Sequence, residues 1–235
     1  MNIFECNFKV YLMQDISKED VQESLSKLID KSFYKNENMK DFHEENKIKG
    51  YSFNNLYPLE LSGMYNEGNI YNFQIRCIGE ELKDHFMKFL TNEYTANIKI
   101  LVAESKKILI KPIDRIYSIT SAIVKISDKE KTEYWRNNHN EADFFEYIRK
   151  NSIKKYEVLT GETIDRDLRL FNYERIDNRK PIATNFKGKR ILGDKVTLAV
   201  ETNNEAQNIV YMLLGTGIGD MVPRGYGYMN YQYIK

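Results

Sequence analysis

The sequence predicts an α+β protein in which the order strand, helix, strand, strand, helix, strand occurs twice. Segments with a period-two apolar pattern and segments with a helical pattern follow one another in that order on both sides of Pro112. The chain of 235 residues is also long enough for two small domains. We therefore expect two tandem ferredoxin-like (RRM-like) βαββαβ domains, residues 1–112 and 113–235, with a glycine-rich loop near the C-terminal end.

The first predicted domain begins with a strand over residues 3–12, where apolar side chains alternate. A helix is expected over residues 19–33, because a Ser-to-Asp capping pattern precedes apolar residues at helical spacing. The polar residues 35–49 predict a loop or a short irregular helix. The remaining elements predicted for this domain are strands over 51–61 and 70–78, a helix after Gly79 and a strand over 96–104.

The second predicted domain repeats this order. It starts with a strand over residues 116–126 and a long amphipathic helix over residues 143–159. The remaining elements predicted for it are strands over 168–176, 182–187 and 190–201, a helix over 203–214 and a last strand over 225–234.

Composition excludes several classes of protein. With 42% hydrophobic and 29% charged residues, the chain has the composition of a globular protein, and its apolar runs fall short of the ~20 residues of a membrane helix. Two cysteines, Cys6 and Cys77, form neither a disulfide framework nor a zinc motif. The N-terminal residues lack the order of a signal peptide. We expect a cytoplasmic protein without a membrane partner, a metal site or a cofactor.

The formal net charge of +1 does not indicate a nucleic-acid binder, so any basic surface must be local. Residues 165–195 hold nine basic and five acidic side chains. Within them, Lys187, Lys189 and Arg190 surround Gly188, which predicts the tip of a hairpin. Such a tip can bind the phosphate backbone of RNA, or it can serve solubility alone.

Glycines cluster near the C-terminal end, at Gly215, Gly217, Gly219, Gly225 and Gly227. A dinucleotide fingerprint requires a strand before the glycines, and a Walker phosphate loop requires a closing Gly-Lys-Ser/Thr; both are absent here. Two explanations remain. The glycines form a structural turn between the last helix and the last strand, or their backbone binds an extended polyanion such as RNA. The number of glycines favours the second explanation.

This segment resembles the glycine-rich loop of the CRISPR precursor-RNA-processing endoribonucleases. The resemblance rests on Gly217-x-Gly219 and Gly225-x-Gly227 after a helix, and it extends upstream to residues 156–161, 186–191 and 196–200. It implies that the four glycines, Arg224 and the three hairpin cations bind CRISPR repeat RNA. One departure is the acidic and apolar stretch 220–223, which leaves Arg224 as the one cation between the glycine pairs.

The resemblance also implies a general acid/base. His43 follows the first helix, and a lysine and an aromatic-Ser-Phe strand come after it, as in the family. On this resemblance His43 is the catalytic histidine, with Tyr34 and Lys49 as helpers and Lys47 as a rival to Lys49. We expect no catalytic role for the two other histidines. His85 is predicted on a helix, partly buried or at the surface, and His139 in a solvated polar loop.

The implied reaction needs no metal. The ribose 2′-OH attacks the adjacent phosphate, leaving a 2′,3′-cyclic phosphate and a 5′-OH, and the protein moves protons and offsets charge. One alternative is a non-catalytic RNA-binding scaffold subunit of a CRISPR effector complex. Another is an unrelated two-domain ferredoxin-like protein that binds a small ligand or another protein. The sequence leaves open the repeat recognised, association with other effector subunits, and whether the chain is a monomer or a homodimer.

Overall fold

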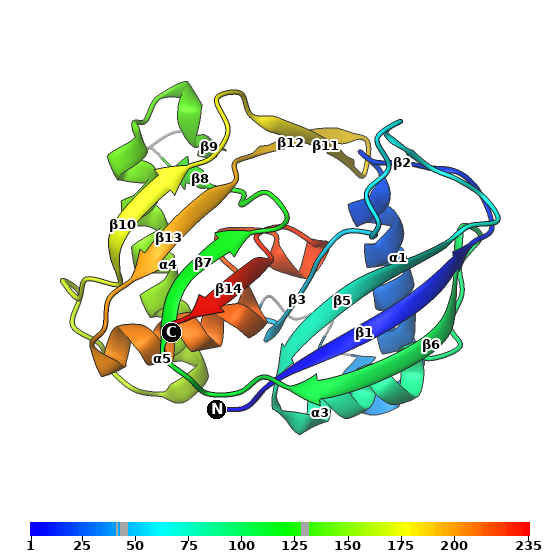
Figure 1. The fold of residues 1–235 in the computed structure, drawn as a ribbon, viewed down its shortest axis with the longest axis horizontal. Coiled ribbons are helices and arrows are strands. Elements are labelled where there is room, and N and C mark those ends of the chain that lie inside the picture. The colour runs from blue at the N-terminus through cyan, green and yellow to red at the C-terminus, as the bar shows by residue number, and fades with distance from the viewer. Residues whose placement is uncertain (41, 43–46, 128–131) are drawn as a thin grey trace.

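The computed structural model describes residues 1–40, 42, 47–127 and 132–235. Two four-stranded antiparallel sheets lie side by side, with strand orders β3-β5-β1-β6 and β10-β13-β7-β14 (Figure 1). In each sheet the first strand of its βαββαβ unit lies between the third and the fourth, which is the ferredoxin-like order. The predicted fold of two tandem ferredoxin-like units is therefore confirmed.

The first unit forms around a long central strand. Its elements are β1 (Ile3–Leu12), α1 (Val21–Tyr34), β3 (Tyr51–Phe53), β5 (Ile70–Ile78), α3 (Gly79–His85) and β6 (Ile98–Lys107). Alternation in β1 buries Phe8 and Val10 against Leu25 and Ile29 of α1. The other face of this sheet carries polar side chains, among them Asn7 and Gln74.

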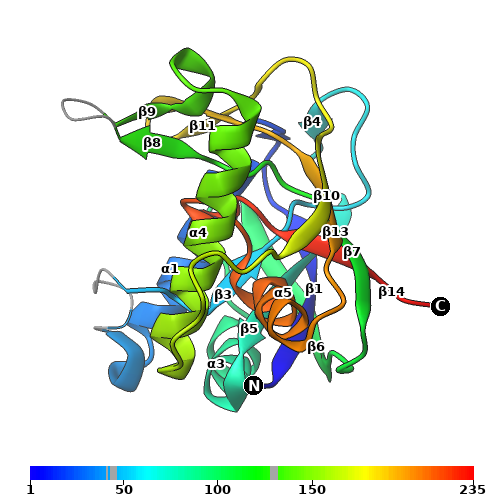
Figure 2. The ribbon, with the colours of Figure 1, turned by 90° about the vertical axis from the view of Figure 1, so that its left-hand side faces the viewer.

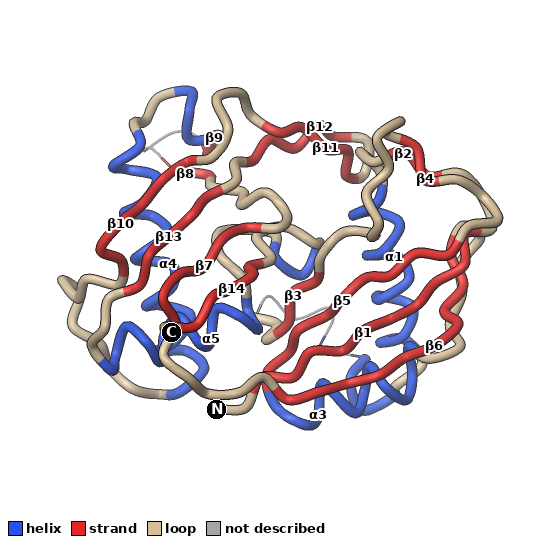
Figure 3. Tube along the Cα trace, viewed as in Figure 1, coloured by secondary structure: helices blue, strands red, loops and turns tan. Residues whose placement is uncertain are grey.

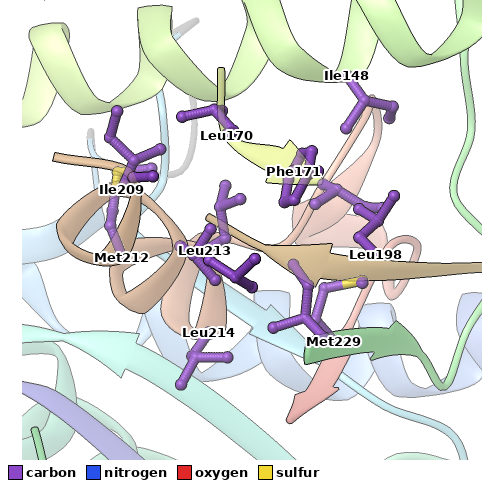
Figure 4. Close-up of a cluster of buried hydrophobic side chains, with 14 of the residues drawn as sticks. Ile148, Leu170, Phe171, Leu198, Ile209, Met212, Leu213, Leu214 and Met229 are labelled. Atoms are coloured by element: carbon purple, nitrogen blue, oxygen red, sulfur yellow. The ribbon is translucent and has the colours of Figure 1, made fainter. Parts of the chain in front are cut away.

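The second unit has the same layers. Its elements are β7 (Ile113–Ser118), α4 (Glu141–Thr160), β10 (Phe171–Ile176), β13 (Val196–Val200), α5 (Asn204–Thr216) and β14 (Met229–Tyr233). Figure 4 shows the core of this unit, where Ile148 of α4 and Leu213 of α5 pack against Phe171, Leu198 and Met229 of the sheet. Figure 2 shows α1 and α4 on the same side of the two sheets.

Short strands lie along the upper edge of the molecule in Figure 3. The predicted hairpin is present as β11 (Ile182–Phe186) paired with β12 (Lys189–Gly193). Two further ladders pair β2 (Ile16–Ser17) with β4 (Met64–Tyr65), and β8 (Lys125–Ser127) with β9 (Thr132–Tyr134). In the described parts of the chain, no helix combines the length and the apolar character needed to cross a membrane.

Several predicted strands are shorter than expected. The strand predicted over 51–61 ends at Phe53, and Pro58, which has no N–H to donate, lies in the loop that follows. The strand predicted over 190–201 is split around Asp194, whose carboxylate accepts hydrogen bonds from Trp135 and Arg136. The last strand begins only at Met229, because Gly225 and Gly227 have positive φ.

A buried arginine joins the two sheets. Arg76 of β5 is 3% exposed; it contacts Glu5 of β1 at 2.8 Å and donates to the backbone oxygen of Met229 in β14. Its guanidinium also lies 4.7 Å from the ring centroid of Tyr228. Burial alone would raise the pKa of Glu5, but Arg76 and Lys106 hold it below its usual range. Charge, hydrogen bonding and ring contact thus fix the sheets relative to each other.

We predict that Arg76→Met lowers the free energy of unfolding by about 3 kcal/mol, because it leaves the buried Glu5 carboxylate without its closest partner. Urea denaturation measures this change. The matched control is Lys150→Met, which removes an exposed partner of Glu146 and should cost less than about 1 kcal/mol. Equal effects of the two substitutions would contradict the role given to Arg76.

Candidate nucleic-acid interface and active site

The basic hairpin is a fixed projection of the second unit onto the first. Lys187 and Gly188 form its turn with φ of 49° and 70°, and the side chains of Lys187, Lys189 and Arg190 are exposed. The backbone N–H of Lys187 donates to the Glu23 carboxylate of α1 at 2.7 Å. The structure therefore presents the three predicted cations together on an anchored tip.

The glycine-rich segment is packed inside the protein. Gly217, Gly219, Gly225 and Gly227 are all buried and all have positive φ. A Cβ at any of them would lie closer than 3.0 Å to another atom of the chain, and at Gly227 that atom is the backbone oxygen of Ile218. Close packing thus accounts for these glycines without a ligand. Contact between RNA and their backbone stays a prediction.

Arg224, the cation between the glycine pairs, contacts the first unit. Its Nη1 lies 2.9 and 2.6 Å from the two carboxylate oxygens of Asp30 in α1. Its guanidinium lies 5.9 Å from the ring centroid of Phe186 in the hairpin. The ion pair offsets part of the charge that a phosphate would meet, so the predicted phosphate contact requires RNA to share or displace Asp30.

The predicted catalytic histidine, His43, lies outside the described residues. Tyr34 is the last residue of α1, with 54% of its side chain exposed. The ammonium of Lys49 donates to the backbone oxygen of Phe42 and lies 5.1 Å from the centroid of its ring. Lys49 therefore contacts the residue that directly precedes His43 in the chain. The side chain of its rival, Lys47, is exposed.

The other two histidines differ in environment. His85 is 3% exposed, so the expectation of a partly buried or surface side chain is wrong; it packs among Phe33, Phe86 and Phe89. Burial lowers its pKa to about 4, which keeps the imidazole neutral near pH 7. His139 is half-buried, and its Nδ1 lies 3.6 Å from the Asp143 carboxylate.

A cleft of about 840 Å³ lies between the units, and sequence reasoning missed it. Amide side chains line it, namely Asn7, Gln22, Asn54, Asn55, Asn72, Gln74 and Asn230. Three tyrosines, Tyr57, Tyr226 and Tyr228, line it as well. Asn and Gln at alternate positions of strands that bury apolar side chains on the other face were the signal that could have found it.

Hydrogen bonds order part of this lining. Gln74 donates from Nε2 to Asn7 Oδ1 at 2.8 Å, and its backbone N–H donates to Asn54 Oδ1 at 2.7 Å. The hydroxyl of Tyr228 donates to Gln74 Oε1 at 3.1 Å, and burial raises the pKa of this tyrosine, which keeps its proton in place. The cleft thus offers positioned amides and aromatic rings, the groups that bind the edges and faces of unpaired bases.

Metal ligands do not gather in the part of the chain that the structure describes. Among these described residues, no three His, Cys, Asp or Glu side chains lie close enough together to hold a metal ion.

Comparisons with known proteins agree with the fold. The family model of the CRISPR associated protein Cas6, C-terminal, matches residues 102–231, more than half of the chain. No curated protein matches.

Solved structures match over nearly the whole chain. A CRISPR associated protein Cas6 has a TM-score of 0.75 at 16% identity, covering 98% of this chain and 99% of its own. An RAMP protein binding different RNA substrates has a TM-score of 0.74 at 16% identity, covering 97% and 99%. The product of a Cas6-related gene from Pyrococcus furiosus has a TM-score of 0.74 at 15% identity, covering 99% and 100%. At these identities the likeness concerns the fold.

We predict that Gly227→Ala costs more than about 3 kcal/mol of stability, because its φ of 66° and the nearby Ile218 oxygen leave no room for a methyl group. Gly161→Ala is the matched control: its φ is 76°, nothing lies within 4 Å of the added Cβ, and it should cost about 1 kcal/mol. Thermal and urea denaturation compare the two. A Gly227→Ala protein as stable as the control would refute the packing role.

Proposed function

This chain belongs to the Cas6 family of CRISPR repeat-processing proteins, and we propose that it is a metal-independent endoribonuclease that cleaves CRISPR repeat RNA in the precursor transcript. The products are mature guide RNAs. The observation that carries this proposal is the match of the Cas6 model to residues 102–231. The amide-lined cleft and the basic hairpin support it. The cleft carries groups suited to binding bases, and the hairpin carries cations suited to binding phosphates.

The proposed reaction uses a nucleophile that the RNA itself supplies. The 2′-OH attacks the adjacent phosphorus, its proton leaves, and the 5′-oxygen of the next nucleotide departs with a proton as a 5′-OH. The remaining strand ends in a 2′,3′-cyclic phosphate. His43 is assigned to proton transfer, because an imidazole with an ordinary pKa exchanges protons near neutrality. Lys49 and Tyr34 are assigned to stabilising the negative charge that develops on the phosphate.

RNA binding is assigned to two surfaces with different tasks. Lys187, Lys189 and Arg190 at the hairpin tip bind phosphates, which gives affinity for any RNA. The amides and tyrosines of the cleft read unpaired bases, which gives specificity. Arg224 joins the first group if a phosphate shares it with Asp30. The four glycines are buried, so their contribution to RNA binding is the backbone geometry that they fix.

We predict that the wild-type chain cleaves the CRISPR repeat RNA of its own genome in excess EDTA, leaving a 2′,3′-cyclic phosphate. His43→Ala should bind the same RNA and cleave it at least about 100-fold more slowly, which is the usual contribution of general acid/base catalysis. His139→Ala is the control and should cleave normally. A repeat with a single 2′-deoxy at the cut site should bind without being cut.

Each other result has a distinct meaning. Cleavage that EDTA abolishes would refute the metal-independent mechanism. Normal cleavage by His43→Ala would assign the proton transfer to another residue. If the wild-type chain binds the repeat and does not cut it, the protein is a non-catalytic RNA-binding subunit.

We predict that the two binding surfaces respond differently to salt. Lys189→Ala should weaken binding of all RNAs alike and reduce the slope of log K against log salt by about one, because it removes one phosphate contact. Asn72→Ala should weaken binding of the cognate repeat alone, by roughly 5- to 100-fold, and leave the slope unchanged.

The controls are exposed residues outside the interface, Lys150→Ala on α4 and Asn208→Ala on α5. Filter binding at four salt concentrations, with cognate and scrambled RNA, measures all five proteins. An Asn72→Ala protein that loses affinity equally for both RNAs would contradict base reading by the cleft.

A further inference from the structure

We propose that His85 is a positioning residue for cleavage, which holds the described ends of the segment that leads from α1 to His43. The inference rests on the proposed function and adds a residue to it. His85 is the last residue of α3, and its side chain is 3% exposed, so it does not meet RNA itself. Its contacts reach both ends of the segment, one by a hydrogen bond and the other through a stacked ring.

Hydrogen bonds join His85 to the first end of the segment. Its Nδ1 lies 3.0 Å from Asn36 Nδ2, just beyond the end of α1, and its Nε2 lies 3.1 Å from Ser32 Oγ. Asn36 in turn accepts from the backbone N–H of Asn38 at 3.2 Å and caps the short 3-10 helix Glu37–Met39. The imidazole therefore holds the side chain that starts this turn.

The partners assign the tautomer of His85. The Ser32 hydroxyl donates to the backbone oxygen of Ile29 at 2.7 Å, so its oxygen accepts the proton of Nε2–H. Nδ1 then carries a lone pair and accepts from the amide of Asn36, whose own oxygen is engaged by Asn38. A neutral imidazole suits both bonds, and burial lowers the pKa of His85 to about 4, which favours that form.

Stacked rings join His85 to the other end of the segment. Its ring lies 4.2 Å from that of Phe33, with 13° between the planes, and Phe33 lies 5.5 Å from Phe42. Phe42 directly precedes His43, and its carbonyl, which belongs to the peptide bond between the two, accepts from Lys49. Residue 42 is thus held by its ring and by its backbone.

The helix after His85 changes geometry at this site. Residues Phe86–Leu90 form a π-helical turn, a rare arrangement that occurs often at functional sites. Within this turn Phe86 lies edge-on to Phe33 at 5.7 Å, and Phe89 stacks with His85 at 5.5 Å. A phenylalanine at position 85 would keep an aromatic ring in this stack. The imidazole is distinguished only by its two hydrogen bonds, so these bonds are the feature to test.

The experiment separates hydrogen bonding from packing. His85→Phe keeps a ring in the stack and removes both bonds, Asn36→Ala removes one bond from the other side, and His85→Asn keeps an acceptor near the position of Nδ1. For each variant we measure single-turnover cleavage at saturating enzyme, Kd for the uncleavable 2′-deoxy repeat, and Tm. His139→Phe is the matched control.

We expect His85→Phe and Asn36→Ala each to slow cleavage by about tenfold or more with Kd unchanged within about twofold, because a misplaced group loses orientation and not affinity. The double variant should be no slower than either single one, since both remove the same bond. His85→Asn should recover most of the rate. Amide exchange at Asn38 and Met39 should be faster in His85→Phe than in the wild type.

Normal cleavage by His85→Phe, additive losses in the double variant, or a rate loss matched by a loss of affinity would each overturn the proposal. A wild-type chain that does not cut refutes the proposed function first. In that case unchanged amide exchange in His85→Phe would also refute the positioning, whereas faster exchange would show that His85 holds the segment of a protein that does not cleave.

Discussion

The close packing of the backbone in the glycine-rich segment constrains the rest of the structure. The backbone N–H of Ile218 donates to the oxygen of Gly227 at 3.0 Å, and that of Gly227 donates to the oxygen of Ser121 at 2.9 Å. A side chain at Gly217 or Gly227 would push apart the backbone segments around these two residues. Because they stay together, the residues between the glycines reach the first unit, where Arg224 contacts Asp30 and Gly225 lies against Phe53.

The same crossing forms the candidate interface. It brings Tyr226 and Tyr228 into the cleft and sets β14 beside Arg76, so the amides of the first sheet face aromatic rings of the second unit. The hairpin of β11 and β12 adds a further contact between the units, because Lys187 at its turn donates to Glu23 of α1. The surfaces proposed to bind bases and phosphates, and the end of α1 that leads to His43, thus depend on one junction. A glycine-rich segment can therefore matter for RNA binding through the geometry it fixes.

Much of the fold could be predicted from the sequence, because strands and helices buried on one face leave a periodic pattern. The strands at residues 3–12 and 70–78 agree with their predicted bounds, and so does the hairpin turn at Lys187 and Gly188. Less of the site could be predicted. The pattern of apolar residues shows which side of a strand is polar but not what that side faces. It therefore does not single out Asn7 and Gln74 as residues that line a cleft. The burial of His85 depends on Phe33, 52 positions away, and local sequence holds no sign of that contact.

In the proposed complex, one RNA strand occupies both the cleft and the end of α1. Photo-crosslinking of a repeat RNA that carries a 2′-deoxy at its cut site, followed by mass spectrometry, tests it most directly. We expect crosslinks to peptides that contain Tyr57 or Tyr228 from nucleotides away from the cut, and to residues 34–49 from those at the cut. Crosslinks confined to the outward faces of α4 and α5, with none in the cleft, would contradict it.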